Sequence, residues 1–260
     1  MIESLRIERE GRLLALALNR PEKRNALSVE LCRALTEAFD QADRDPSVGA
    51  ILLSGEGKSF CSGMDLNEVL ARAQEGIDEA HEALFSTSAR ISKPIVAAVH
   101  GAALAGGMGL VAVCHVVLAA ESASFGLTEI LRGLWPFLIH QTVSLAIGER
   151  RAAELSLTGR IIGAAEAREF GLVHQVVPDS ELRARSREAA SRLASSSPTA
   201  IQAGMRFLQQ IRGKSAGETT EIARRLRSEV FASADFAEGV RAFREKRAPR
   251  WPSLERHFST

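Results

Sequence analysis

The most apolar part of the chain, residues 95–120, is also interrupted by glycines, and this combination constrains the fold more than any other feature. An apolar run of this length raises the question of a membrane span. However, Pro94 precedes the run, and His100 and His115 lie within it. A buried strand, a glycine turn, a short helix and a second strand explain this pattern better. We therefore expect a soluble protein with no membrane partner.

Composition and charge exclude several classes of protein. With 260 residues, 45% of them hydrophobic, the chain can bury a substantial core. A formal net charge of +1 provides no field that would attract nucleic acid. The three cysteines and six histidines show neither disulfide nor metal-ligand spacing, so no metal is expected. The charged opening segment does not resemble a signal peptide, which makes a cytoplasmic location the expectation.

Strands and helices are predicted to alternate up to residue 178. Strand-like runs at 5–8 and 13–18 flank Glu10-Gly11, which predicts a hairpin. Ser28 is the expected N-cap of a helix that ends before Asp45-Pro46. Further buried strands are expected in three short apolar runs, at residues 50–53, 95–99 and 116–119. These elements predict an α/β core.

The pattern becomes helical after Pro178. Helices are predicted at about 179–194, 199–212, 217–232 and 235–246, with breaks at 195–198 and at Gly213. We therefore divide the chain into a core at 1–178 and a helical region at 179–260. The apolar faces of these helices must cover either the chain's own core or a neighbouring subunit.

Two glycine-containing corners follow buried strands, at residues 60–66 and 100–109. Each corner could present a backbone N–H group at the start of a helix, and two such groups on one oxygen would stabilise an oxyanion. Tight turns and close packing explain each corner, taken alone, at least as well. A dinucleotide site is disfavoured because Gly107-x-Gly109 lacks the third glycine of that fingerprint.

A series of blocks, in order along nearly the whole chain, resembles the crotonase superfamily, the enoyl-CoA hydratase/isomerase family. The blocks are Arg24–Ser28, Phe60–Leu66, Lys93–Gly101 with the corner after it, Phe125–Glu129, Leu157–Arg160, Gly171–Val173 and Phe243–Arg247. The resemblance implies a crotonase-like spiral of ββα units with a C-terminal helical region that forms trimers, often paired as hexamers. It also implies an acyl-CoA thioester substrate and no separate cofactor, because coenzyme A is part of the substrate.

The resemblance also implies roles for individual residues. The backbone N–H groups of Met64 and Gly106 would form the oxyanion hole for the thioester carbonyl. The residues implied to contact CoA are Arg24, Ala26, Leu27, Lys58, Phe243 and Lys246, the last two from a neighbouring subunit. Exposure to solvent, with no ligand contact, is the alternative for the side chains of Arg24 and Lys58.

One expected carboxylate is missing. Family members that hydrate 2-enoyl thioesters carry two glutamates, and here the corresponding positions hold Gly109 and Glu129. A single carboxylate is poorly suited to activating water while also delivering a proton. It can, however, take a proton from C2 and return it at C4, which moves a double bond from C3 to C2. The segment around Glu129 resembles the Δ3,Δ2-enoyl-CoA isomerases, and burial would raise the pKa of its carboxyl toward neutrality.

The favoured function is therefore 3-enoyl-CoA isomerisation with Glu129 as the acid and base. A 2-enoyl-CoA hydratase, or another enolate-forming CoA enzyme, is the alternative within the family. A non-catalytic CoA-binding or scaffolding protein is the alternative of another class. The acyl pocket is expected to include Gly109, Trp135, Phe137 and His140, although plain packing or a subunit contact explains the aromatic pair equally well.

Overall fold

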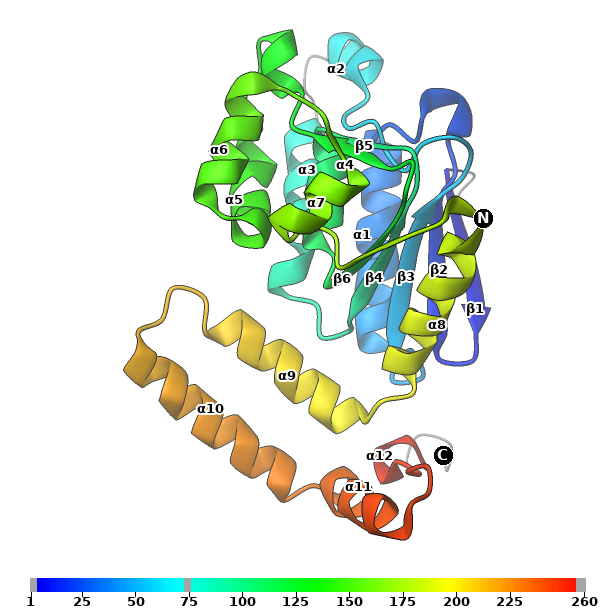
Figure 1. Ribbon diagram of the computed structural model, residues 1–260, viewed down its shortest axis with the longest axis vertical. Coiled ribbons are helices and arrows are strands. Elements are labelled where there is room, and N and C mark those ends of the chain that lie inside the picture. Colours follow the sequence, from blue (N-terminus) through cyan, green and yellow to red (C-terminus); the bar gives the residue numbers. More distant parts are fainter. Residues whose placement is uncertain (1–3, 73–75, 256–260) are drawn as a thin grey trace.

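A six-stranded sheet forms the centre of the protein in this computed structural model, which describes residues 4–72 and 76–255 (Figure 1). The strand order is β1-β2-β3-β4-β6-β9. The strands are β1 (Leu5–Glu10), β2 (Leu13–Leu18), β3 (Ala50–Gly55), β4 (Ile95–Val99), β6 (Val116–Ala120) and β9 (Gln175–Val177). Strands β1 and β2 form the predicted antiparallel hairpin, and the other neighbours are parallel. The core is therefore an α/β structure, as the sequence predicted.

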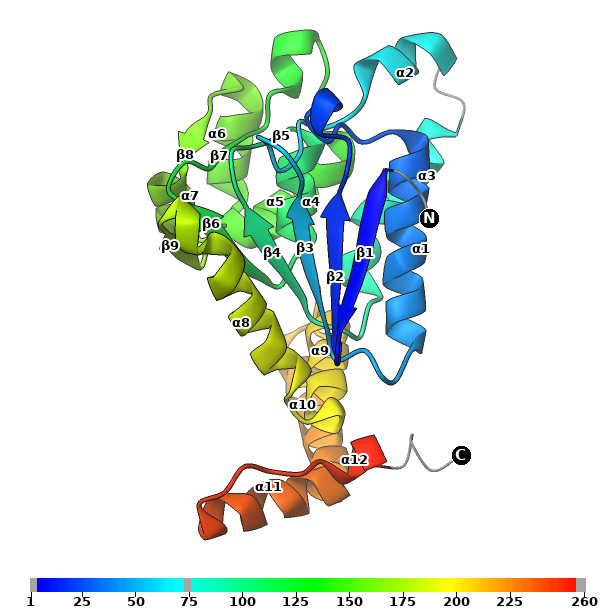
Figure 2. The same ribbon diagram turned by 90° about the vertical axis from the view of Figure 1, so that its right-hand side faces the viewer.

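Helices cover both faces of this sheet (Figure 2). On one face, α1 (Val29–Arg44), α3 (Ile77–Phe85) and α4 (Gly106–Val113) enclose the larger apolar core. On the other face, α8 (Leu182–Ala194) packs on β3, β4 and β6. The side chain of Ser28 accepts a hydrogen bond from the backbone N–H of Leu31, which confirms it as the N-cap of α1.

A smaller three-stranded sheet lies beside the first and carries the chain toward the candidate site. It consists of β5 (Ala102–Leu104), β7 (Ser124–Gly126) and β8 (Ile162–Gly163), with β5 and β7 parallel. The nearby helices are α2 (Leu66–Arg72), α5 (Phe137–Ile147), α6 (Glu149–Thr158) and α7 (Ala164–Phe170). Helix α4 connects β5 of the smaller sheet to β6 of the larger one.

The C-terminal helices form a separate layer below the sheet in Figure 1. They are α9 (Pro198–Gln210), α10 (Ala216–Phe231), α11 (Ala234–Glu245) and the short α12 (Pro252–Glu255). These bounds agree closely with the helices predicted from the sequence. The side-chain amide of Gln209 donates to the carbonyl of Ile91, 2.7 Å away, and links α9 to the core.

The long apolar run at 95–120 is divided between β4, β5, α4 and β6, as its glycines indicated. Among the described residues, no helix combines the length and apolar character needed to cross a membrane.

Candidate active site

The two glycine-containing corners lie side by side. Cys61 and Ala103 form a parallel bridge, in which the Cys61 N–H donates to the carbonyl of Ala102 at 3.0 Å. The N–H of Leu104 donates to the carbonyl of Cys61 at 2.9 Å. A Cβ atom built on Gly63 would stand 3.2 Å from the backbone nitrogen of Gly106. The segment after β3 and the start of α4 therefore meet directly.

Two backbone N–H groups remain available at this junction. Met64 pairs with Leu27 in a parallel bridge, but its own N–H takes no part in the hydrogen bonds of that bridge. The Leu27 N–H donates to the carbonyl of Gly63, and the Asp65 N–H donates to the carbonyl of Leu27. In a parallel ladder this pattern leaves the Met64 N–H directed away from Leu27. Gly106 is the first residue of α4, and its N–H has no acceptor within the helix. Neither group donates a hydrogen bond within residues 4–72 and 76–255.

The backbone of Ala105 adopts an uncommon conformation at this corner. Its φ of +51° lies in the left-handed region that non-glycine residues rarely adopt. Its N–H donates to the carbonyl of Gly126, 2.8 Å away at the end of β7. The Leu27 side chain and the Phe85 ring border Gly106, 3.2 and 3.4 Å from a Cβ built there. The surroundings of Gly106 are thus largely apolar, and in such surroundings a developing negative charge gains most from backbone N–H donors.

Glu129 is a buried carboxyl with an unpaired oxygen. It begins a short 3-10 turn (Glu129–Arg132), three residues after the Gly126 carbonyl that holds Ala105. The residue is 9% exposed, and its Oε2 has no hydrogen-bond partner in the described structure. Burial raises the pKa of Glu129 to about 7, while its own backbone N–H and the charge of Arg132 oppose this shift. Such a carboxyl can both accept and return a proton near neutral pH.

The other position at which a hydratase of the family would carry a glutamate holds a glycine, Gly109. Gly109 is buried within α4, one turn after Gly106, and lies against Ile139 of α5. No second titratable side chain therefore comes from α4 at this point. Within the described residues, no group of His, Cys, Asp or Glu side chains is arranged to hold a metal ion.

Asn25 holds the segment that supports Met64. It is fully buried with a φ of +55°, and its amide donates to the carbonyls of Glu56 and Ser59 at 2.9 and 2.8 Å. Its side-chain oxygen accepts from the N–H of Arg20. No role for Asn25 was predicted from the sequence, where it stands only within the block Arg24–Ser28, because an asparagine that follows charged residues is usually exposed.

Replacing Asn25 with alanine is expected to lower the free energy of unfolding by about 2–4 kcal/mol, because one buried and two partly buried backbone groups lose their partner and the strained φ remains. Asn25→Gly removes the strain but not the loss of hydrogen bonds, so it should be less destabilised than Asn25→Ala. Asn67→Ala, at an exposed site, is the control and should unfold like the wild type. Urea denaturation measures all three. An Asn25→Ala protein as stable as the control would contradict the supporting role.

An ion pair ties the same segment to the start of α2. The guanidinium of Arg20 donates to the carboxylate of Asp65 at 2.9 Å and to the carbonyl of Ala26 at 2.6 Å. Burial alone would raise the pKa of Asp65, but the hydrogen bond and charge of Arg20 lower it overall. Asp65 directly follows Met64, so this pair holds the backbone next to the free N–H group.

The residues predicted to bind CoA fall into two groups. Ala26 and Leu27 are buried beside Met64. Arg24, which lies just before them, and Lys58, in the loop that leads to Met64, are both exposed. The Arg24 carbonyl accepts the N–H of Ser62, which places its backbone against the first corner. Phe243 (84% exposed) and Lys246 belong to the end of α11, in the separate layer of Figure 1 far from α4. The structure therefore does not bring these two together with the site of the same chain.

The three side chains predicted for the acyl pocket differ in their surroundings. Phe137, at the start of α5, is 75% exposed in the single chain. Trp135 and His140 are half-buried, with ring centroids 5.5 Å apart. The Nδ1 of His140 lies 3.0 Å from the Ser156 hydroxyl, which itself donates to the carbonyl of Ala152. His140 is thus held by α6, and Ile139, which the sequence analysis did not single out, is the α5 residue that reaches Gly109.

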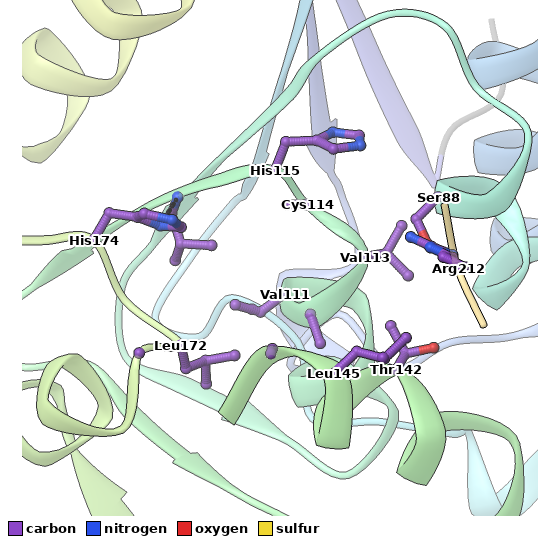
Figure 3. A pocket seen from close by; sticks show the side chains of 14 residues that line it. Ser88, Val111, Val113, Cys114, His115, Thr142, Leu145, Leu172, His174 and Arg212 are labelled. Carbon is purple, nitrogen blue, oxygen red and sulfur yellow. Dashed lines mark hydrogen bonds between the residues drawn. The ribbon is translucent and has the colours of Figure 1, made fainter. Parts of the chain in front are cut away.

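A cavity of about 270 Å³ lies at the other end of α4, around Val113 and Cys114 (Figure 3). Its two histidines are structural: the Nδ1 of His115 accepts from the N–H of Ile95, and that of His174 accepts from the N–H of Val117. Burial lowers the pKa of His115 to about 4. Neither ring is therefore positioned to act with Glu129.

A nucleophilic cysteine is not supported by the structure. Cys61 is fully buried, and burial raises the pKa of its thiol to about 12. A thiol that remains protonated at neutral pH is a poor nucleophile. Its place at the junction of the two corners is explained by packing.

Comparison with known proteins agrees with this geometry. The sequence profile of the enoyl-CoA hydratase/isomerase family matches residues 8–254. The chain is 36% identical to enoyl-CoA hydratase EchA19 of Mycobacterium tuberculosis over 259 residues, covering 94% of this chain and 95% of the relative. It is 35% identical to mevalonyl-coenzyme A hydratase of Aspergillus fumigatus over 252 residues, covering 92% and 91%.

Solved structures show the same fold. The enoyl-CoA hydratase of Mycobacterium smegmatis superposes with a TM-score of 0.91 at 31% identity, covering 95% of this chain and 98% of that one. The enoyl-CoA hydratase of Bacillus anthracis gives 0.91 at 30% identity, covering 96% and 99%. The chain therefore belongs to the enoyl-CoA hydratase/isomerase family and is an enzyme with the crotonase fold, as the sequence blocks indicated.

Proposed function

We propose that the enzyme moves the double bond of a 3-enoyl-CoA to the 2-position, with Glu129 as its single acid and base. One observation carries this proposal. Glu129 provides a buried carboxyl with a pKa of about 7, whereas the position of the second carboxyl holds a glycine, Gly109. Fold alone does not choose between the reactions of a family, so the site residues must.

The proposed reaction consists of two proton transfers. The Glu129 carboxylate removes a proton from C2 of the 3-enoyl thioester, and the electron pair spreads over the dienolate. The N–H groups of Met64 and Gly106 donate to the thioester oxygen as its negative charge develops. The protonated carboxyl then returns the proton at C4, which leaves the double bond between C2 and C3. No water is consumed, and the carboxylate is regenerated.

The remaining parts of the proposal concern binding and assembly. The CoA moiety would lie along the segment Arg24–Leu27, with Arg24 and Lys58 available for its phosphates. Phe243 and Lys246 would reach the CoA held by a neighbouring copy, in a trimer or hexamer formed through the C-terminal helices. Trp135 and His140 would border the acyl chain, and no separate cofactor would be needed. A cytoplasmic location remains part of the proposal.

Hydration of a 2-enoyl-CoA is the second candidate, because the relatives carry the name hydratase. In that reaction one group must deprotonate a water while a proton reaches C2. Gly109 offers no group for either task, and Glu129 would have to do both. We therefore rank hydration second, and a protein that binds CoA without turnover third.

The deciding experiment compares substrates. Purified enzyme is incubated separately with a 3-enoyl-CoA and a trans-2-enoyl-CoA, and the products are identified by mass and by absorbance of the conjugated thioester. The proposal expects rapid conjugation of the first and little 3-hydroxyacyl product from either. Rapid hydration of the second substrate would refute it, and binding of a CoA analogue without any turnover would favour the non-catalytic alternative.

A labelled substrate tests the single-base step. With a 3-enoyl-CoA carrying deuterium at C2, one carboxyl shielded from solvent should deliver part of that deuterium to C4 of the product. Two separate groups, or exchange with bulk water, would replace the label by solvent hydrogen. We expect measurable C2-to-C4 transfer by mass spectrometry under single-turnover conditions. Absence of deuterium at C4 would contradict a shielded single base.

A further inference from the structure

The contact between α4 and α5 at Gly109 is unusually close. A Cβ atom built on Gly109 would stand 2.4 Å from Cγ2 and 2.7 Å from Cβ of Ile139, distances that real Cβ atoms do not tolerate. Ile139 is itself buried, with 3% of its surface exposed. The two helices can therefore approach this closely only because residue 109 has no side chain. Gly109 and Ile139 are matched to each other.

This matched pair lies close to the proposed oxyanion hole. Gly109 is one helical turn after Gly106, so the two glycines share a face of α4. The side chain of Ile139 consequently fills the space that a side chain on residue 109 would take within one turn of the Gly106 N–H. An aliphatic group there provides no hydrogen bond for a water molecule.

We propose that Ile139 is a specificity-determining residue, whose side chain occupies the volume of a second acid–base group and so restricts the enzyme to proton transfer through Glu129. This inference rests on the proposed isomerase function. It explains why glycine stands at position 109: any carboxylate introduced there would meet α5 before it could reach a substrate. The glycine at 109 and the isoleucine at 139 are then two parts of one structural arrangement.

The proposal predicts that the two positions must be changed together. Gly109→Glu alone should lower Tm by several degrees, because Ile139 blocks the new side chain, and should not create hydration activity. Ile139→Gly alone should also lower Tm, by leaving a cavity. The double variant should have a higher Tm than the sum of the single shifts predicts. It should also hydrate a trans-2-enoyl-CoA at least about tenfold faster than either single variant, since acid–base groups contribute on the order of a hundredfold or more.

Glycine is chosen at 139 because alanine would retain the Cβ atom that lies 2.7 Å from the one built on residue 109. Val143, one turn further along α5 and fully buried, provides the matched control. Val143→Gly opens a cavity in the same helix away from Gly109, so it should not rescue Gly109→Glu. Equal rescue by Val143→Gly, or shifts in Tm that simply add in the Ile139 double variant, would overturn the matched pair.

The wild-type assay separates this inference from the proposed function. If the wild type isomerises 3-enoyl-CoA but the double variant gains no hydration, the role of Ile139 in specificity is wrong and the isomerase stands. If the wild type hydrates rapidly, the isomerase is wrong, and the restriction by Ile139 is refuted with it. The coupling in Tm would then show only that the two residues pack together.

Discussion

Replacement of Glu129 by glutamine is expected to reduce kcat for 3-enoyl-CoA isomerisation by about a thousandfold, the typical range for loss of a general acid–base group. Glutamine keeps the size of the side chain but can neither take nor return a proton. Because no second carboxylate lies at position 109, no other group is placed to compensate. KM should change little, since the backbone N–H groups of Met64 and Gly106, in their proposed role, would still bind the thioester oxygen. Steady-state kinetics on the purified variant measures both constants.

The pH dependence provides an independent check on the same carboxyl. The reaction starts from the ionised form, so kcat/KM of the wild type should fall about tenfold per pH unit below the pKa of about 7. In Glu129→Gln the residual rate should lack that decline. Glu149→Gln, at an exposed site on α6, is the control and should behave like the wild type. A Glu129→Gln enzyme that retains more than a tenth of wild-type kcat would refute the assignment.

Substitution of Gly107 by alanine is expected to have the second largest effect, because it separates the two corners. A Cβ atom on Gly107 would stand 2.2 Å from the carbonyl oxygen of Cys61, which accepts the N–H of Leu104. The start of α4 must therefore move away from the segment that carries Met64. We expect Tm to fall by about 5–10 °C and kcat to fall on the order of a hundredfold, as when one oxyanion donor is lost.

Gly204→Ala is the matched control for that substitution. Gly204 lies within α9, is exposed, and has no atom within 4 Å of a Cβ built on it. Alanine favours a helix by about 1 kcal/mol over glycine, so Tm should remain or rise slightly. Calorimetry and turnover on both variants compare the same chemical change at a crowded and an open position. Wild-type values for Gly107→Ala would show that the corners are not held by this contact.

The sequence predicted the local elements because their signals are local. Alternating apolar residues around Glu10-Gly11 predicted the hairpin, and the Ser28 cap and helical periodicity predicted α1. The helices after Pro178 were found for the same reason. The adjacency of Gly63 and Gly106 is different, because it depends on a bridge between Cys61 and Ala103 that no periodicity reveals. Only the resemblance to the crotonase superfamily provided it.

The candidate site was predicted in part. Glu129 was identified from the family spacing, and its burial and raised pKa agree with that expectation. Asn25 was missed because an asparagine side chain is usually exposed. Its burial here depends on contacts with carbonyls that are distant in sequence. Ile139 was missed because one isoleucine in an apolar helix has no distinguishing signal. The signal lay instead at Gly109, since a glycine in a buried helix commonly marks the close approach of another helix.

The unpaired oxygen of Glu129 also has a consequence for the folded state itself. Its pKa is raised above the unfolded value of about 4.3, so the proton it holds stabilises the fold. This contribution is fully present below the unfolded pKa and is lost as pH rises through about 7. With Glu129 as the proposed base, activity is therefore expected to rise over the same pH interval in which this group ceases to support folding. Residues such as Asn25 and Arg20, which hold the site by contacts independent of that proton, carry the structure where the reaction takes place.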